Sequence, residues 1–365
     1  MDKAIIHMKK RTVSLLVTFL FIGLTSAQNR KTQVSIKGNQ FYINKKITYQ
    51  GRYWNGHKIE GLLMNSRMVQ GIFDDLNPNT KDLFAYADTK VWDADRNTNE
   101  FIQNMSNWYD HGLLAFTLNL QGGSPLGYGN NGWVNTTFDE KGNLRIPYLN
   151  RLERILDKAD SLGMVVIVGY FYFGQDQHLE NETAVIHAVD EISKWLLQKK
   201  YRNLLIEINN EANIQYDHPI LNPQNVGALI TRVKKLSNNK LLAGTSFGGG
   251  TIPNSEIVKV SDFILIHGNG VKETTRITEM VELTKKVEGY RNQPILFNED
   301  DHFNFEADEC NFTAAVKAYA SWGYFDYRMK EEGFEEGYQS VPVDWGINSS
   351  RKKAFFLKLK EITGK

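Results

Sequence analysis

Two glutamates end two apolar segments of this 365-residue chain, and together they could do acid–base and nucleophilic chemistry. Residues 206–211 read IEINNE, and residues 295–299 read ILFNE, so the segments end at Glu211 and Glu299. Hydrolysis of a glycosidic bond needs one protonated carboxyl group to assist the leaving oxygen, and one ionised carboxylate to attack or to activate water. Burial and mutual repulsion keep the pKa values of such a pair apart. The pair predicts this chemistry if the fold brings the two side chains together.

The elements that must position these glutamates alternate along the chain. Apolar strand segments are followed by stretches with apolar residues at helical spacing. Strands are expected at 67–74, 113–120, 164–173, 204–209, 241–246, 263–267, 294–299 and 324–328. Helices are expected at 96–111, 149–162, 185–197, 226–236, 277–287, 312–320 and 354–362. This alternation over about 300 residues predicts an α/β fold of the (β/α)8 TIM-barrel type.

An open doubly wound sheet is the main alternative to the barrel. No glycine fingerprint for a dinucleotide follows the first expected strands. The triplet Gly248-Gly249-Gly250 follows a strand, but a bare triplet is a weak phosphate signal, and a tight loop is the expected structure there. The barrel is therefore the predicted fold.

The N-terminal region divides into a targeting segment and a hairpin. Lys9, Lys10 and Arg11 precede an apolar stretch over residues 12–24, and Thr25-Ser26-Ala27 supplies small residues for cleavage. This pattern predicts a signal peptide over residues 1–27 and a mature chain of residues 28–365 that is secreted or periplasmic. An uncleaved membrane anchor is the alternative. Two short strands about Gly38-Asn39 predict a β-hairpin within the 28–60 segment.

Charge and cysteine content limit the partners and the chemistry. Without residues 1–27 the chain carries 39 basic and 41 acidic residues, and it contains no basic block. This balance argues against nucleic acid as a partner and against an electrostatic membrane anchor. Cys310 is the only cysteine, so an intrachain disulfide is impossible, and an inert thiol is expected. The composition indicates no oligomeric state and no cofactor.

In a TIM barrel the active site lies at the carboxyl ends of the strands, which is where both glutamates fall. The layout resembles the clan A glycoside hydrolases, the barrel group that includes the family 5 endoglucanases and mannanases. Asn210-Glu211 ends the fourth expected strand, Glu299 ends the seventh, and Glu207 stands four residues before Glu211. The segment 41–51 is similar to the hairpin that covers the barrel floor in those enzymes. The resemblance spans essentially all of residues 28–365, taken as one catalytic domain.

The resemblance implies a retaining mechanism and a set of roles. Glu299 would be the nucleophile that forms a glycosyl ester, and Glu211 would donate a proton and later deprotonate water. Asn210 would bind the sugar 2-hydroxyl. The expected carboxyl separation is about 5–5.5 Å.

Further residues at the strand ends are candidates for the site. His267 ends the sixth expected strand, where similar enzymes use an aromatic residue or a histidine to hold the nucleophile. The tyrosine often found two residues later is absent here, which leaves open what orients Glu299. Arg67 and Asn65, near the first strand, are further candidates to orient Glu299. Arg67 could also bind substrate, or it could pair with Glu207 inside the barrel; the structural pairing is favoured.

Aromatic side chains suit sugar binding because their faces pack on pyranose rings. Trp322 stands before the eighth expected strand, where similar enzymes often place a tryptophan under the cleaved sugar. Tyr172 ends the third strand. Both are predicted to contact substrate, with packing in the core as the alternative for each.

The run Asp300-Asp301-His302 offers metal-ligating side chains directly after Glu299. Consecutive residues rarely converge on one ion, and spaced zinc motifs are absent, so no metal site is predicted. The sequence thus predicts a glycosidase acting on a polysaccharide or oligosaccharide. A carbohydrate-binding barrel without catalysis, and a metal-dependent hydrolase using the 300–302 run, are the alternatives.

Overall fold

The computed structural model describes residues 30–129 and 132–365. The predicted signal peptide lies outside these residues and stays a prediction. Among the described residues, no helix is both long and apolar enough to cross a membrane.

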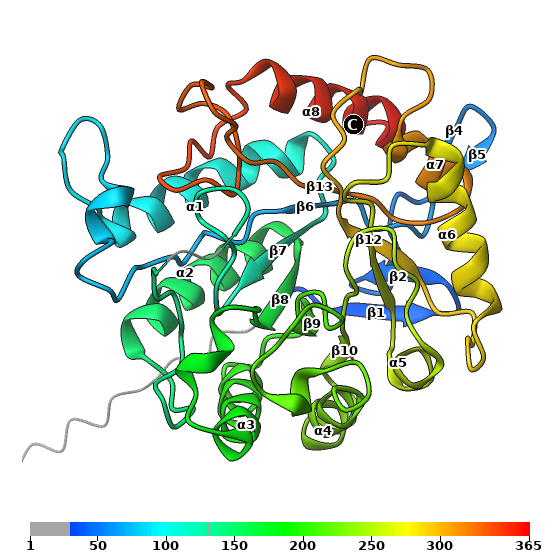
Figure 1. Ribbon diagram of the computed structural model, residues 1–365. Helices are drawn as coiled ribbons and strands as arrows, with labels where there is room; N and C mark the ends of the chain where they lie inside the picture. The colour runs from blue at the N-terminus through cyan, green and yellow to red at the C-terminus, as the bar shows by residue number, and fades with distance from the viewer. Residues whose placement is uncertain (1–29, 130–131) are drawn as a thin grey trace, which may run out of the picture.

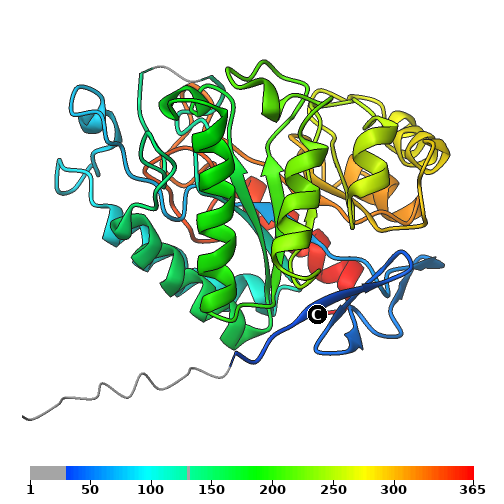
Figure 2. The same ribbon diagram turned by 90° about the horizontal axis from the view of Figure 1, so that it is seen from below.

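The described chain begins with the predicted hairpin. Strand β1 (Val34–Lys37) pairs antiparallel with β2 (Gln40–Ile43), and β3 (Lys46–Ile47) adds a third strand to this small sheet. Gly38 turns the chain with a φ of 58°, which a residue without a Cβ adopts freely. A second small pair, β4 (Tyr53–Trp54) with β5 (His57–Lys58), follows. Figure 2 shows the hairpin at the end of the barrel opposite the long loops.

Parallel strands form the centre of the molecule (Figure 1). Six of them lie in the order β10-β9-β8-β7-β6-β13, and β11 pairs with β12. Their bounds are β6 Asn65–Arg67, β7 Ala115–Asn119, β8 Val165–Phe171, β9 Leu204–Asn209, β10 Leu242–Gly244, β11 Ile264–His267, β12 Ile295–Glu299 and β13 Gly323–Tyr324.

Two contacts close these strands into a barrel. The backbone N–H of Asp262, just before β11, donates to the carbonyl of Ala243 in β10 at 2.9 Å. Leu296 in β12 forms a parallel bridge with Ser321, just before β13. The predicted (β/α)8 barrel is therefore confirmed.

A helix follows every barrel strand and packs outside it, as Figure 1 shows. The helices are α1 Ala94–Asp110, α2 Ile146–Leu162, α3 Glu182–Gln198, α4 Gly227–Leu236, α5 Ser255–Val260, α6 Thr274–Lys286, α7 Asn311–Lys317 and α8 Ser350–Thr363. Several caps are visible in the sequence. Asp93 and Asn181 accept backbone N–H bonds at the starts of α1 and α3, and Gly163 ends α2 with a φ of 82°.

The apolar residues form two cores. The smaller core fills the barrel interior at the amino-terminal ends of the strands. Phe41 of the hairpin covers that end and packs in the same core as Leu205 and Leu296. The larger one lies between the barrel and the helix layer. Both faces of each strand are buried, which explains why the strand segments read as continuous apolar runs.

The bounds predicted from the sequence were wrong for the first and last strands, and one helix was not predicted. Strand β6 occupies residues 65–67 rather than 67–74, and β13 occupies 323–324 rather than 324–328. Both strands are only two or three residues long, too short to show a pattern. The helix α5 has six residues and is likewise too short to show a clear periodic pattern.

Candidate active site

Glu211 lies just beyond the end of β9, where the end of β10 holds its backbone. Its N–H donates to Ser246 Oγ at 2.9 Å, and the next residue, Ala212, donates to the Ser246 carbonyl at 2.9 Å. Glu211 adopts a φ of 53°, a left-handed conformation that is costly for a residue with a side chain. Such conformations persist where surrounding contacts enforce them, often at functional sites.

Glu299 is the last residue of β12, and its carboxylate is held on both oxygens. Arg67 Nε lies 2.8 Å from Glu299 Oε2, and Asn269 Nδ2 donates to Oε1 at 2.7 Å. Only 6% of the Glu299 side chain is exposed, and Arg67 is fully buried. The carboxylate is therefore fixed in position before any ligand arrives.

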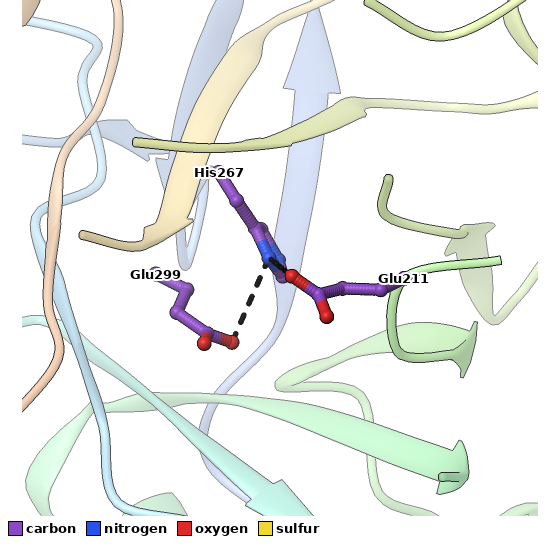
Figure 3. A group of neighbouring side chains, drawn as sticks. All are labelled: Glu211, His267 and Glu299. Atoms are coloured by element: carbon purple, nitrogen blue, oxygen red, sulfur yellow. Dashed lines mark hydrogen bonds and ion pairs between the residues drawn. The ribbon is translucent and has the colours of Figure 1, made fainter. Parts of the chain in front are cut away.

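His267, at the end of β11, lies between the two glutamates (Figure 3). Its Nδ1 is 3.0 Å from Glu211 Oε1 and 3.6 Å from Glu299 Oε2. One oxygen of each carboxylate and the histidine nitrogen all lie within 4.8 Å of one another. The structure thus brings the two predicted glutamates together at the mouth of the barrel.

The surroundings shift the pKa values of the two carboxyl groups in opposite directions. Burial raises the pKa of Glu299, and the charge of Glu211 adds to this rise, while Arg67 and His267 act in the opposite direction. Burial also raises the pKa of Glu211, but the hydrogen bond and the charge of His267 outweigh it and lower that pKa below its ordinary value. Burial lowers the pKa of His267, but Glu299 and Glu211 outweigh burial and raise it.

The geometry indicates where an acidic proton can lie. A proton on Glu299 would point an O–H group at Arg67 or Asn269, which are both donors. A proton between Glu211 and His267 satisfies both groups, because either the carboxyl or Nδ1 can carry it. The donors around Glu299 thus favour its ionised form, and the Glu211–His267 hydrogen bond is the place in the pair where a proton is best accommodated.

Arg67 pairs with Glu299, so the favoured expectation of an ion pair with Glu207 is wrong. Among the described residues, the Glu207 side chain forms no ion pair and receives a hydrogen bond from Asn298 Nδ2 at 3.4 Å. The reason lies in the position of β6, which ends at Arg67 and places the guanidinium at the level of Glu211 and Glu299. Because Arg67 is completely buried, it acts on the carboxylate and is not an open substrate contact.

Replacing Arg67 by methionine is expected to reduce both stability and any activity that depends on Glu299. Breaking a buried ion pair from one side typically costs about 3–5 kcal/mol, because the remaining charge is left uncompensated. Thermal unfolding should detect this loss. As a control, Arg154→Met removes an ion pair with Asp95 whose side chains are 37% and 69% exposed, and it should change stability by less than about 1 kcal/mol. Equal losses in the two variants would contradict the role assigned to Arg67.

Asn210 and Tyr172 lie beside the pair. The Asn210 backbone donates to the carbonyl of Phe171, and its own carbonyl accepts from Tyr216. Both amide atoms of its side chain are buried and have no partner among residues 30–129 and 132–365. Tyr172 is buried, its hydroxyl lies 3.0 Å from Ser124 Oγ, and its ring centroid is 6.0 Å from the Arg67 guanidinium. It forms a wall of the site without offering an open face.

Trp322 does not reach the mouth of the barrel. Its side chain is fully buried, its ring stacks on Phe312 of α7 with centroids 4.8 Å apart, and its Nε1 donates to Asp300 Oδ2 at 3.0 Å. Because β13 starts at Gly323, the alternation of side chains points Trp322 outward to the helices. Its position therefore gives it a packing role and does not support the predicted contact with sugar.

Three residues near the pair were not predicted. Phe325 follows β13, and by the alternation of side chains it points into the barrel, with its ring 5.9 Å from the Arg67 guanidinium. Tyr128, 55% exposed, contacts Phe325 edge-on with centroids 5.8 Å apart. Asn269 binds Glu299 from the position two residues after His267, and that spacing was the one available signal for it.

Asp300, Asp301 and His302 do converge, contrary to the expectation for consecutive residues. Their ligand atoms lie within 4.8 Å of one another. Protein donors already occupy the buried Asp300, however. Asn311 Nδ2 lies 3.2 Å from its Oδ1 and His302 Nδ1 lies 2.8 Å from the same oxygen, while Trp322 binds Oδ2. Asp300 therefore ties the end of β12 to α7 and to β13, which is a structural role.

The loop with three glycines is tight, as expected. Gly250 turns with a φ of 72° and donates to the His267 carbonyl at 3.0 Å. A Cβ on Gly249 would lie 2.2 Å from the Asn269 carbonyl oxygen. Glycine at 249 thus allows the Asn269 backbone to pack closely behind the site.

Comparison with known proteins gives matches at the level of structure alone. No protein-family model and no curated protein matches the sequence. A glycoside hydrolase family 5 mannosidase from Rhizomucor miehei is 11% identical, with a TM-score of 0.56, over 92% of this chain and 98% of that one. A broad-specificity endoglucanase from Clostridium longisporum is 12% identical, with a TM-score of 0.52, over 82% and 96%.

A longer Bacteroides vulgatus protein, described as a putative glycoside hydrolase, also matches. It is 12% identical, with a TM-score of 0.52, and the match covers 87% of this chain. The chain spans 60% of the length of that protein. The resemblance found in the sequence is thus confirmed for the fold: the chain has the (β/α)8 fold of the family 5, clan A glycoside hydrolases.

Proposed function

We propose that this protein is a retaining glycoside hydrolase, with Glu211 as acid/base and Glu299 as nucleophile. The observation that carries the proposal is the approach of the two carboxylates, whose nearest ligand oxygens lie within 4.8 Å. Retaining enzymes hold their carboxyl groups about 5–5.5 Å apart, whereas inverting enzymes need about 6.5–9.5 Å to fit a water molecule between them.

The first step would form a glycosyl ester. A carboxylate oxygen of Glu299 attacks the anomeric carbon, the glycosidic C–O bond breaks, and the proton of the Glu211–His267 pair moves through Glu211 to the leaving oxygen. Arg67 and Asn269 hold the attacking carboxylate, so little reorganisation is needed in the transition state.

The second step would release the sugar. Glu211, now ionised, takes a proton from water as the water oxygen attacks the anomeric carbon, and the ester bond to Glu299 breaks. The hydrogen bond between His267 Nδ1 and Glu211 Oε1 at 3.0 Å lets the pair regain its starting protonation. The partnerless amide of Asn210 is placed to bind a sugar hydroxyl during both steps.

The substrate class follows from the same site. An O-glycosidic bond in a polysaccharide or oligosaccharide fits a carboxylate pair at an open barrel mouth. The structurally similar proteins include, by name, a mannosidase and an endoglucanase, which makes mannans and glucans the first substrates to test.

A glycan panel tests the proposal. Purified protein should release reducing sugar from at least one member, and an E211Q/E299Q double variant prepared in the same way should release none. Binding of a glycan without any product from the wild type would instead support a non-catalytic carbohydrate-binding barrel. Activity lost on exhaustive chelation would support a metal-dependent hydrolase.

The pH dependence of kcat/KM should be bell-shaped. Glu299 must be ionised to attack, so activity is lost as pH falls through its pKa, which lies above the ordinary 4.5. The Glu211–His267 pair must hold a proton, so activity is lost as pH rises through the pKa of His267, which lies above 6.5. The profile of kcat/KM reports these groups in the free enzyme. An acid limb below pH 4.5 would contradict the environment described for Glu299.

A further inference from the structure

We propose that Asp301, Tyr128 and Asn269 form a positioning chain that fixes one amide orientation and thereby holds Glu299. The chain runs from the exposed rim of the barrel to the carboxylate by consecutive hydrogen bonds. It rests on the proposed function only for its kinetic consequence, because its effect on the carboxylate is independent of turnover.

The chain has a defined direction. Tyr128 donates its hydroxyl proton to Asp301 Oδ2 at 2.8 Å, so toward Asn269 that hydroxyl acts as an acceptor. Asn269 Nδ2 lies 3.4 Å from this hydroxyl and 2.7 Å from Glu299 Oε1. The two protons of one amide nitrogen thus have two acceptors, and the nitrogen must face the carboxylate.

The opposite amide orientation is disfavoured by the same neighbours. It would place Asn269 Oδ1 against Glu299 Oε1, an acceptor against an acceptor. Only a Tyr128 hydroxyl turned toward Oδ1 could compensate, and Asp301 already holds that proton. In the observed orientation Oδ1 has no partner in the part of the chain that the structure describes. Asp301 therefore selects the productive orientation through Tyr128.

The backbone around Asn269 is also held. Gly270 N donates to Asp301 Oδ1 at 3.1 Å, so one carboxylate binds both the loop of Asn269 and the hydroxyl of Tyr128. Behind the loop, Gly249 packs against the Asn269 carbonyl. These contacts place the amide without any contribution from a ligand.

The other groups that face Glu299 set the background for a titration. They come from separate elements and comprise Arg67, His267, Glu211, Tyr128 and Tyr172. None of them changes in the variants below except Tyr128, which loses only its hydroxyl. A donor removed from an ionised carboxylate raises its pKa, because the charged form loses a stabilising hydrogen bond.

The test is a titration of the Glu299 carboxyl carbon by NMR in protein labelled at glutamate, with E299Q to assign the signal. N269A should raise the apparent pKa by about one pH unit. Y128F, which keeps the ring, should raise it by a smaller amount. The Y128F/N269A double variant should titrate like N269A, because the tyrosine acts through the asparagine. An unchanged pKa in N269A, or fully additive shifts in the double variant, would overturn the chain.

A neighbouring tyrosine supplies the matched control. Tyr327 contacts the Tyr128 ring edge-on with centroids 4.9 Å apart, and among the described residues no hydrogen bond joins its hydroxyl to Asn269. Y327F should titrate like the wild type. A shift as large as that of Y128F would mean that loosening of the aromatic cluster is the cause, and this would overturn the proposal.

Kinetics separate this inference from the proposed function. If the protein hydrolyses a glycan, N269A should lower kcat by about 10- to 100-fold with KM changed less than about twofold, since the lost contact serves the transition state. If no glycan is hydrolysed, the proposed function fails while the titration still decides the positioning chain.

Discussion

Replacing Glu299 by alanine is expected to abolish turnover, with kcat reduced by at least about 10⁴-fold. The carboxylate makes the covalent bond in the proposed mechanism, and the described structure offers Arg67 and Asn269 beside it, neither of which can replace a nucleophile. Initial rates on the best substrate of the glycan panel measure the loss. E309A supplies a control, because the Glu309 side chain is 63% exposed in a surface ion pair with Lys317.

Azide identifies the role that Glu299 plays. In E299A the missing carboxylate leaves space on the face from which the nucleophile attacks, so azide should enter there. The product from an activated aryl glycoside should be a glycosyl azide of inverted configuration, because a single displacement replaces two. A turnover rate in E299A close to that of E309A would refute the assignment of the nucleophile.

The second large effect is expected for Glu211→Ala. General acid–base assistance contributes about 10²- to 10⁴-fold, and hydrolysis of a natural glycan should fall by that factor because its leaving group needs a proton. An aryl glycoside with a good leaving group needs none, so its first step should survive and the glycosyl ester should accumulate. A burst of released phenol measures this accumulation.

Azide should rescue E211A and give a glycosyl azide of retained configuration. It would attack the ester on Glu299 without needing deprotonation, so two displacements would still occur. His267 remains in this variant and bounds the space left by the carboxylate. If E211A gave an inverted azide and E299A a retained one, the two roles would have to be exchanged.

The approach of Glu211 and Glu299 could be predicted from the sequence because each glutamate ends an apolar strand segment. In a parallel barrel the carboxyl ends of the strands meet at one mouth, so Glu211 and Glu299 had to approach once the barrel was recognised. The hairpin followed from its turn residues, and most helix bounds followed from periodicity and, at the end of α2, from Gly163.

The supports of the pair could not be predicted in the same way. Arg67 and Trp322 lie on or beside strands of two or three residues, and the direction of each side chain depends on the phase of its strand, which such short segments do not reveal. Asn269 and Tyr128 lie in loops after different strands. Their contact depends on loop conformations that the sequence does not reveal. The absence of a tyrosine two residues after His267 showed only that another residue must orient Glu299.

The configuration of the first product decides whether Glu299 attacks the sugar as a nucleophile. Proton NMR during early hydrolysis by the wild type, before the sugar mutarotates, distinguishes the two anomers. The close approach of Glu211 and Glu299 predicts that the new reducing end has the same anomeric configuration as the bond that was cleaved. A first product of opposite configuration would rule out the retaining mechanism, because it would require water, and not Glu299, to attack the sugar.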